Sequence, residues 1–235
     1  MDEIIRRVRS ELQQNAAPEK KAGGERFFKE EVTLYGVTIP TVNRIASSYL
    51  PDVKRLTKGE VFSLCDELWQ TNYMEEAIIA CIWSHAMRKS YEADDIDVFE
   101  RWVSSYVTNW ATCDTLCNHS VGDLIDMYPP LVDKLRLWGG SDNRWMRRAA
   151  AVSLIVPARR GRFLQEVFEI ADILLRDTDD LVRKGYGWML KAASEAHQPE
   201  VFDYVMRHKA VMPRTALRYA IEKMPVALKM QAMAR

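Results

Sequence analysis

The sequence predicts an all-α fold, and three observations support that prediction. Apolar residues recur with a period near 3.6 along almost the whole chain of 235 residues. Ser, Thr, Asp, Asn or Pro stands before most of these stretches, as is common at helix starts. No stretch alternates apolar and polar residues as a half-buried strand does, and no Asn-Gly or Asp-Gly hairpin turn occurs.

Seven helices are expected in the first half, and each has a polar or proline residue at or just before its start. They span residues 2–14, 19–31, 39–49, 58–70, 73–88, 95–107 and 110–126. Their markers are Asp2, Pro18, Thr38, Thr57, Asn72, Asp94 and Asn109.

Seven more helices are expected in the second half. They span residues 129–138, 143–156, 163–175, 180–194, 198–208, 213–222 and 225–233. The helix at 163–175 depends on its apolar period alone, and the others also carry a proline or polar marker. The connections are short, such as Thr71-Asn72 and Gly139–Asp142, so we expect one domain over residues 1–235.

The helices also repeat. The segment beginning at Trp145 aligns with the one beginning at Leu181, 36 residues later, and with the one beginning at Tyr73, 72 residues earlier. A helical period of this length is typical of HEAT-like or armadillo-like solenoids, in which antiparallel helix pairs stack and curve around a concave groove. The alternative is a compact helical bundle.

Composition excludes several classes of protein. The apolar fraction of 48% suits a folded core rather than a disordered chain. No apolar run is long enough for a membrane helix, and the charged N-terminal segment does not resemble a signal peptide. Four scattered cysteines do not form a disulfide framework. We expect a cytoplasmic protein with no membrane partner.

The net charge is zero, but the charges are segregated along the chain. Residues 60–100 hold ten acidic and two basic residues, a net charge of −8. Residues 134–162 hold eight basic residues and one acidic residue, a net charge of +7, and residues 207–235 carry +6. A basic groove could therefore bind a polyanion, and the alternative is that these are solvated helix faces.

Tryptophan is frequent, with seven residues, and most simply serves the core at Trp69, Trp83 and Trp102. Trp110 differs because Asp114 follows it at the i+4 position, on the same helical face. An indole beside a carboxylate suits a site that receives a cationic or electron-poor group. The alternative is that Asp114 accepts a hydrogen bond from a neighbouring helix end.

Cations recur at equivalent positions of the repeat. Arg147-Arg148 and Arg183-Lys184 each lie near the start of a helix, a spacing that suits successive phosphates. Trp188 follows Lys184 by one turn. Gly185 and Gly187 indicate a close approach, by a packed helix or by a ligand, and packing is the commoner reason.

No metal or organic cofactor is expected. Cys113 and Cys117 stand one helical turn apart, but without further ligands nearby they are more simply buried thiols than a zinc site. None of the common phosphate-binding, hydrolase or metalloprotease motifs occurs.

Four motifs in order resemble the DNA alkylation repair family of HEAT-like alkylpurine DNA glycosylases, over nearly the whole chain. They are Arg26–Lys29 with Tyr35–Pro40, Trp110-x-x-x-Asp114, Asp142–Ala150 and Lys184–Leu190. The resemblance implies an all-helical solenoid whose concave basic face holds duplex DNA, and hydrolytic excision of N3- and N7-alkylated purines.

The resemblance also implies roles for particular residues. Asp114 matches the catalytic carboxylate, Trp110 and Trp188 match aromatic residues that line the lesion site, and Arg148 matches a DNA-contacting arginine. Phe27 stands where some members have Tyr, so the ring is kept and the hydroxyl is lost. The residues expected to contact DNA are Arg148, Arg147, Lys184, Arg183, Phe27 and Lys29.

Two functions stay open. The first is a monofunctional glycosylase of base excision repair, in which a carboxylate stabilises the oxocarbenium ion and orients water. No lysine suggests a Schiff base, so no lyase step is expected. The second is a non-catalytic HEAT-repeat scaffold that binds DNA or protein. A monomer is the default expectation, because DNA requires a free groove.

Overall fold

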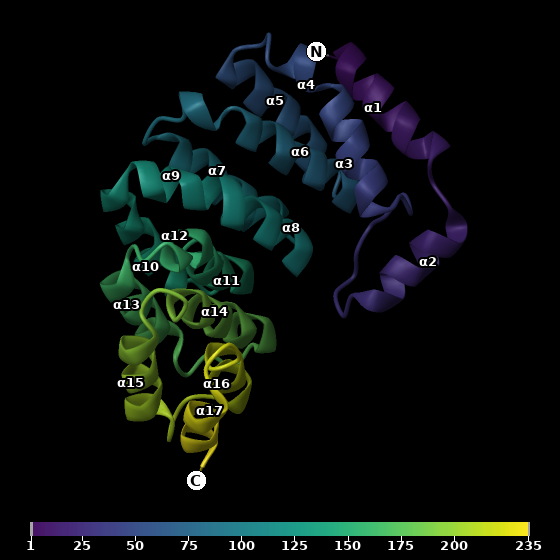
Figure 1. Ribbon diagram of the computed structural model, residues 1–235. Coiled ribbons are helices and arrows are strands. Elements are labelled where there is room, and N and C mark those ends of the chain that lie inside the picture. Colours follow the sequence, from purple (N-terminus) through teal and green to yellow (C-terminus); the bar gives the residue numbers. More distant parts are fainter. Residues whose placement is uncertain (1, 235) are drawn as a thin grey trace. The chain divides into compact units, whose positions relative to one another are not determined.

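The protein is helical throughout the residues that the computed structural model describes, 2–234 (Figure 1). Within that range it contains no β-strand, and an isolated bridge joins Thr33 to Tyr73. The predicted all-α, solenoid-like fold is thereby confirmed. The chain divides into two compact units between Leu116 and Cys117, and each is described by itself. That they act as one domain stays a prediction.

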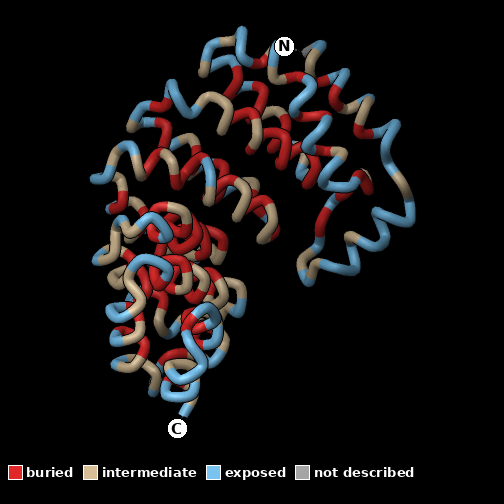
Figure 2. The backbone as a smooth tube through the Cα atoms, viewed as in Figure 1, coloured by how far each residue is buried: buried red, intermediate tan, exposed pale blue. Residues whose placement is uncertain are grey.

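The first unit is built around one buried helix. Its helices are α1 (Asp2–Gln14), α2 (Pro18–Phe27), α3 (Ile39–Ser48), α4 (Leu50–Val53), α5 (Lys58–Trp69), α6 (Met74–Ala86), the 3₁₀ turn η1 (Arg88–Ser90), α7 (Asp95–Tyr106) and α8 (Trp110–Leu116). Helix α6 packs against α3, α5 and α8, and most of its residues are buried (Figure 2). Its apolar run therefore supports three neighbours at once.

The core tryptophans lie where the sequence predicts. Trp69, Trp83 and Trp102 are buried. The indole N–H groups of Trp83 and Trp102 donate hydrogen bonds to polar partners. Trp83 Nε1 donates to the carbonyl of Ala46 at 2.9 Å, and Trp102 Nε1 donates to Asp66 at 2.5 Å. Burial of Trp83 and Trp102 is thus compatible with their polar atoms, whereas the buried Trp69 Nε1 has no hydrogen-bond partner among the described residues.

One helix of the first unit is shorter than expected. The prediction of 19–31 is wrong at its end, because α2 stops at Phe27 and residues 28–38 are extended or irregular. None of the residues of α2 is buried. The extended backbone instead buries Val32 and Leu34 against the unit. Tertiary contacts at 32–37 decide this boundary, and a local helical pattern does not reveal them.

The second unit stacks helix pairs. Its elements are the π-helical turn η2 (Cys117–Val121), α9 (Gly122–Met127), the 3₁₀ turn η3 (Pro129–Leu131), α10 (Val132–Gly139), α11 (Arg144–Val152), α12 (Ile155–Arg159), α13 (Leu164–Leu174), α14 (Asp180–Ala193), α15 (Gln198–His208), α16 (Arg214–Ala220) and α17 (Val226–Met233). Helix α14 packs against α11 and α16. The 36-residue repeat therefore places its two later copies, α11 and α14, side by side.

Two predicted helices are interrupted. The helix predicted over 143–156 ends at Val152, and α12 follows after Ser153 and Leu154. Pro157 has no N–H to give the Ser153 carbonyl, so the α-helical ladder breaks there. The helix predicted over 110–126 contains the π-helical turn η2 between α8 and α9. Such π-helical turns are rare and occur mostly as single turns inside α-helices.

Candidate active site

The first unit presents an aromatic cluster made of Phe27, Phe28 and Trp110. The Trp110 ring lies 6.0 Å from the Phe27 ring and 5.5 Å from the Phe28 ring, centroid to centroid. The two phenylalanine rings meet edge to face at 5.4 Å. Phe27 is 70% exposed, whereas Phe28 and Trp110 are half-buried. A large ring left so exposed beside other rings is an open apolar surface.

Helix α8 brings the carboxylate to the same place. Its start is fixed by Asn109, which is buried and whose side-chain oxygen accepts from the backbone N–H of Thr112 at 3.0 Å. Trp110 therefore occupies the first turn, and Asp114 follows on the next turn of the same face, half-buried. The predicted pairing of indole and carboxylate on one face is consistent with this helix.

The other predicted residues of the first unit are close in sequence to the cluster. Lys29 follows Phe28 and is exposed, in the extended backbone rather than in the helix expected for 19–31. Phe28 itself was not assigned a role by sequence reasoning. The adjacent phenylalanines could have signalled a paired aromatic surface, but their approach to Trp110, more than 80 positions away, is tertiary.

Trp188 lies on α14 in the second unit and is half-buried. Lys184 precedes it by one turn and pairs with Asp180 at 2.8 Å. The hydrogen bond and the charge of Asp180 raise the pKa of the Lys184 ammonium above its usual value, although burial opposes them. Lys184 is therefore held by Asp180 one turn before it on the same helix.

The arginines of the repeat are held by the protein itself. Arg148 is 5% exposed and donates to the carbonyl of Leu181. Arg147 pairs with Asp177 at 2.6 Å, and Arg183 donates to the Asp177 carbonyl at 2.6 Å. Arg148 thus joins α11 to the first turn of α14, Arg147 joins α11 to the turn that precedes α14, and Arg183 joins α14 to that same turn. Each arginine therefore has a structural partner in addition to any external phosphate.

The basic segment 134–162 is much less charged in space than in sequence. At least six of its eight basic residues form ion pairs, and each acidic partner lies outside residues 134–162. The six are Arg136, Arg144, Arg147, Arg159, Arg160 and Arg162. A net charge of +7 along the chain does not translate into seven free cations on one surface.

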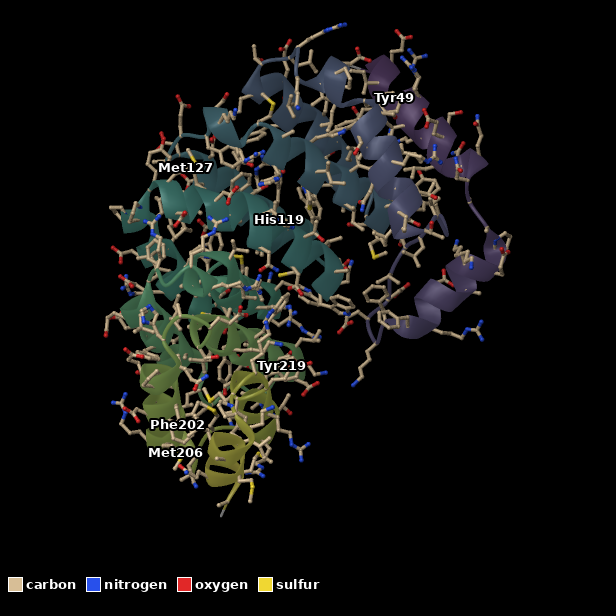
Figure 3. The ribbon with its side chains drawn as sticks, viewed as in Figure 1. Tyr49, His119, Met127, Phe202, Met206 and Tyr219 are labelled. Carbon is tan, nitrogen blue, oxygen red and sulfur yellow. The ribbon has the colours of Figure 1, made fainter. Side chains whose placement is uncertain are left out.

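Of the two glycines of α14, Gly187 has the packing role that the sequence favoured. A Cβ on Gly187 would lie 2.7 Å from Tyr219 Cβ and 2.8 Å from the carbonyl oxygen of Ala216, both on α16. Tyr219 is labelled in Figure 3. A Cβ on Gly185 would lie 3.5 Å from Arg148 Cγ on α11, an ordinary contact. Gly187 therefore permits the close approach of α14 and α16.

The cysteines are buried thiols, as predicted. Cys113 and Cys117 are free and buried, like Cys65 and Cys81. Burial raises the pKa of the Cys65 thiol well above its usual range. Among residues 2–234, no group of three or more His, Cys, Asp or Glu side chains is placed to hold a metal ion. No helix in that same range is long and apolar enough to cross a membrane.

Sequence reasoning also missed two buried carboxylates at the start of α6. Glu75 is 1% exposed and accepts from three consecutive backbone N–H groups, those of Tyr35, Gly36 and Val37, at 2.9–3.1 Å. Glu76 is fully buried and binds Arg9 and the Tyr35 hydroxyl. A signal was present, because this copy of the repeat has two acids where the other copies have two cations.

Comparison with known proteins agrees with this architecture. A profile of the DNA alkylation repair enzyme family matches residues 8–224. No curated protein sequence matches the chain. A solved structure described as a predicted DNA alkylation repair enzyme from Enterococcus faecalis is similar, with a TM-score of 0.81 and 15% identity over 90% of this chain and 98% of that chain. At that identity the likeness shows the fold.

Proposed function

Because the chain belongs to the DNA alkylation repair enzyme family, we propose that it is a monofunctional DNA glycosylase for N3- and N7-alkylated purines in duplex DNA. The observation that carries the proposal is the placement of Asp114 one turn after Trp110 on α8, with Trp110 in an open aromatic cluster. Such a surface suits a flat, cationic base and a nearby developing charge.

The proposed reaction does not require the protein to protonate the departing base. Alkylation at N3 or N7 makes the purine cationic, so it departs without protonation by a side chain. The deoxyribose then develops oxocarbenium character, which the Asp114 carboxylate would stabilise while it orients the attacking water. Hydrolysis breaks the N-glycosidic bond and leaves an abasic site with the free base, as the first step of base excision repair.

Aromatic faces supply the recognition of positive charge. An indole face attracts a cation by about 0.5–2 kcal/mol, more when water is excluded. The proposal gives this role to Trp110, and, as the resemblance implies, to Trp188 on the second unit. Phe27 contributes a ring without a hydroxyl, so it offers stacking and no hydrogen bond. Recognition at this position is therefore apolar.

The proposal divides the predicted DNA contacts into two groups. Phe27 and Lys29 are exposed in the first unit, and Lys184 in the second is partly exposed and pairs within its own helix, with Asp180, so these three are expected to touch DNA directly. The second group, Arg147, Arg148 and Arg183, already binds carbonyl or carboxylate oxygens of the protein. We expect these arginines to hold α11 and α14 in register and to contribute to phosphate binding with their remaining N–H groups.

The decisive experiment measures release of free base from duplex DNA that carries N7-methylguanine. The wild-type chain is expected to release it, and Asp114→Asn is expected to lose turnover by roughly 10²–10³-fold, as when one charge-stabilising group is removed, while it still binds the duplex. Asp203→Asn, an exposed carboxylate on α15, is the matched control and should match wild type.

Two outcomes would contradict the proposal. Equal release by wild type and Asp114→Asn would remove Asp114 from the reaction. No release by either, with salt-sensitive duplex binding intact, would favour the non-catalytic scaffold.

A further inference from the structure

Helix α2 cannot set its own position. None of its residues is buried, and two adjacent glycines, Gly23 and Gly24, lie within it. A helix without a buried face gains little from packing, and glycine weakens it further. Yet its last residue is Phe27, a member of the aromatic cluster. Something other than α2 must therefore hold these rings against Trp110.

The segment that follows α2, residues 28–38, is fixed to the start of α6. We call it the strap. Glu75 Oε1 accepts from the N–H groups of Gly36 and Val37 at 2.9 and 3.1 Å, and Oε2 accepts from Tyr35 N–H at 3.1 Å. The carbonyl of Thr33 accepts from the N–H of Met74 at 3.0 Å. A buried carboxylate thus satisfies three donors that would otherwise lack partners.

The same point of the strap also ties down the beginning of α2. Gly36 accepts from the N–H of Ala17, the residue before α2, at 3.2 Å. Gly36 has φ of +90°, and a Cβ there would lie 2.5 Å from the Ala17 carbonyl oxygen. The start of α2 is therefore bonded to a residue that Glu75 holds, and the end of α2 continues directly into the strap.

Helix α6 links this attachment to the aromatic cluster. It carries Glu75 in its first turn, and it packs against α8, which carries Trp110. Helix α6 therefore contacts both sides of the cluster indirectly: the two phenylalanines through the strap, and Trp110 through α8.

We propose that Glu75 is a positioning residue for the candidate site: by holding the strap, it sets Phe27 and Phe28 against Trp110. Glu75 acts through the strap and does not touch the cluster, so it is not a catalytic residue. The inference rests on the proposed function for its effect on base release, and on geometry alone for its effect on Trp110.

The test substitutes Glu75→Gln, which keeps the shape of the side chain. Whichever way the carboxamide turns, its NH₂ group faces a backbone N–H of the strap, so at least one of the three bonds is lost. The control is Tyr35→Phe, which removes the hydroxyl bond to Glu76 at 2.7 Å and leaves all three amides bound to Glu75. Gly36→Ala is a second variant, because its added Cβ would collide with the Ala17 carbonyl oxygen and so displace the strap.

The main readout is the fluorine NMR signal of Trp110 in protein labelled with 5-fluorotryptophan. The chain has seven tryptophans, and Trp110→Phe assigns the signal. Glu75→Gln and Gly36→Ala are expected to shift the Trp110 signal, and Tyr35→Phe is expected to leave it in place. In folded Glu75→Gln, an unshifted Trp110 signal would overturn the proposal.

Two further measurements complete the test. In the wild-type chain, the amides of Tyr35, Gly36 and Val37 should exchange at least roughly tenfold more slowly than those of α2, and equal exchange would contradict the proposal even if both variants fail to fold. Single-turnover base release by Glu75→Gln should fall by roughly 10- to 100-fold with duplex binding retained. A wild-type chain that releases no base would contradict the proposed function, whereas the Trp110 signal still decides the positioning role.

Discussion

Two glycines in one helix are expected to respond to alanine with opposite signs. Gly185 and Gly187 lie two positions apart in α14, both buried. A Cβ on Gly187 would meet three atoms of α16: Tyr219 Cβ at 2.7 Å, the Ala216 oxygen at 2.8 Å and Ala216 Cα at 3.1 Å. The three atoms nearest to a Cβ on Gly185 all belong to side chains of α11, at 3.5 Å or more.

The magnitude follows from two opposing terms. Replacing a helical glycine by alanine stabilises a helix by up to about 1 kcal/mol, and this gain is similar at both positions. Forcing extra atoms into a packed contact costs about 1–3 kcal/mol. At Gly187 two of the three opposing atoms belong to the backbone and cannot rotate away, so the cost lies in the upper part of that range. The free energies of unfolding of the two variants should therefore differ by about 2 kcal/mol.

The assay is urea and thermal unfolding followed by circular dichroism at neutral pH. Gly185→Ala should be at least as stable as wild type, and Gly187→Ala should unfold earlier. For a chain of this size, a difference of 2 kcal/mol corresponds to roughly 4–8 °C in midpoint temperature. Equal stability of the two variants would refute the reasoning, because it would mean that α16 can move away from α14 at no cost.

Two other predictions concern charge. Lys184→Ala should lower the slope of log affinity for duplex DNA against log salt by roughly 0.9, the value for one lost phosphate contact, and an unchanged slope would exclude that contact. Burial, followed by the hydrogen bond to Glu11, raises the pKa of Tyr49 from 10.0 to about 12. The neutral phenol is thus favoured in the folded state, so its contribution to the free energy of unfolding is present below pH 10 and lost as pH rises to 12. Tyr49→Phe should remove this part of the alkaline loss of stability, and an identical pH profile would contradict the assignment.

Local signals in the sequence predicted most of the helices. Thr57 and Glu60 form a capping box at the start of α5, and Asn143 caps α11 through the N–H of Trp145. These bonds join residues two or three positions apart, so the pattern of residue types reveals them. The end of α2 was missed because distant contacts decide it, whereas the break before α12 follows from Pro157, a local signal that the predicted range 143–156 did not use.

The candidate site divides in the same way. Trp110 and Asp114 share one short helix, so their common face follows from a spacing of four. The approach of Phe28 to Trp110 does not follow from any sequence spacing, because it depends on where the strap lies in the folded unit. The role of Glu75 is equally hidden, since its three donors lie about 40 positions away.

Charge shows the difference most clearly. The sequence separates acidic and basic segments, whereas the structure pairs Arg147 with Asp177 and Arg144 with Asp179, each across 30 or more positions. By itself, the sequence determined the helical class, the repeat and the indole–carboxylate pair, because helix formation and i, i+4 spacing are local. Only the tertiary structure decided which charges are paired and which aromatic rings meet, because burial and pairing depend on segments brought together by folding.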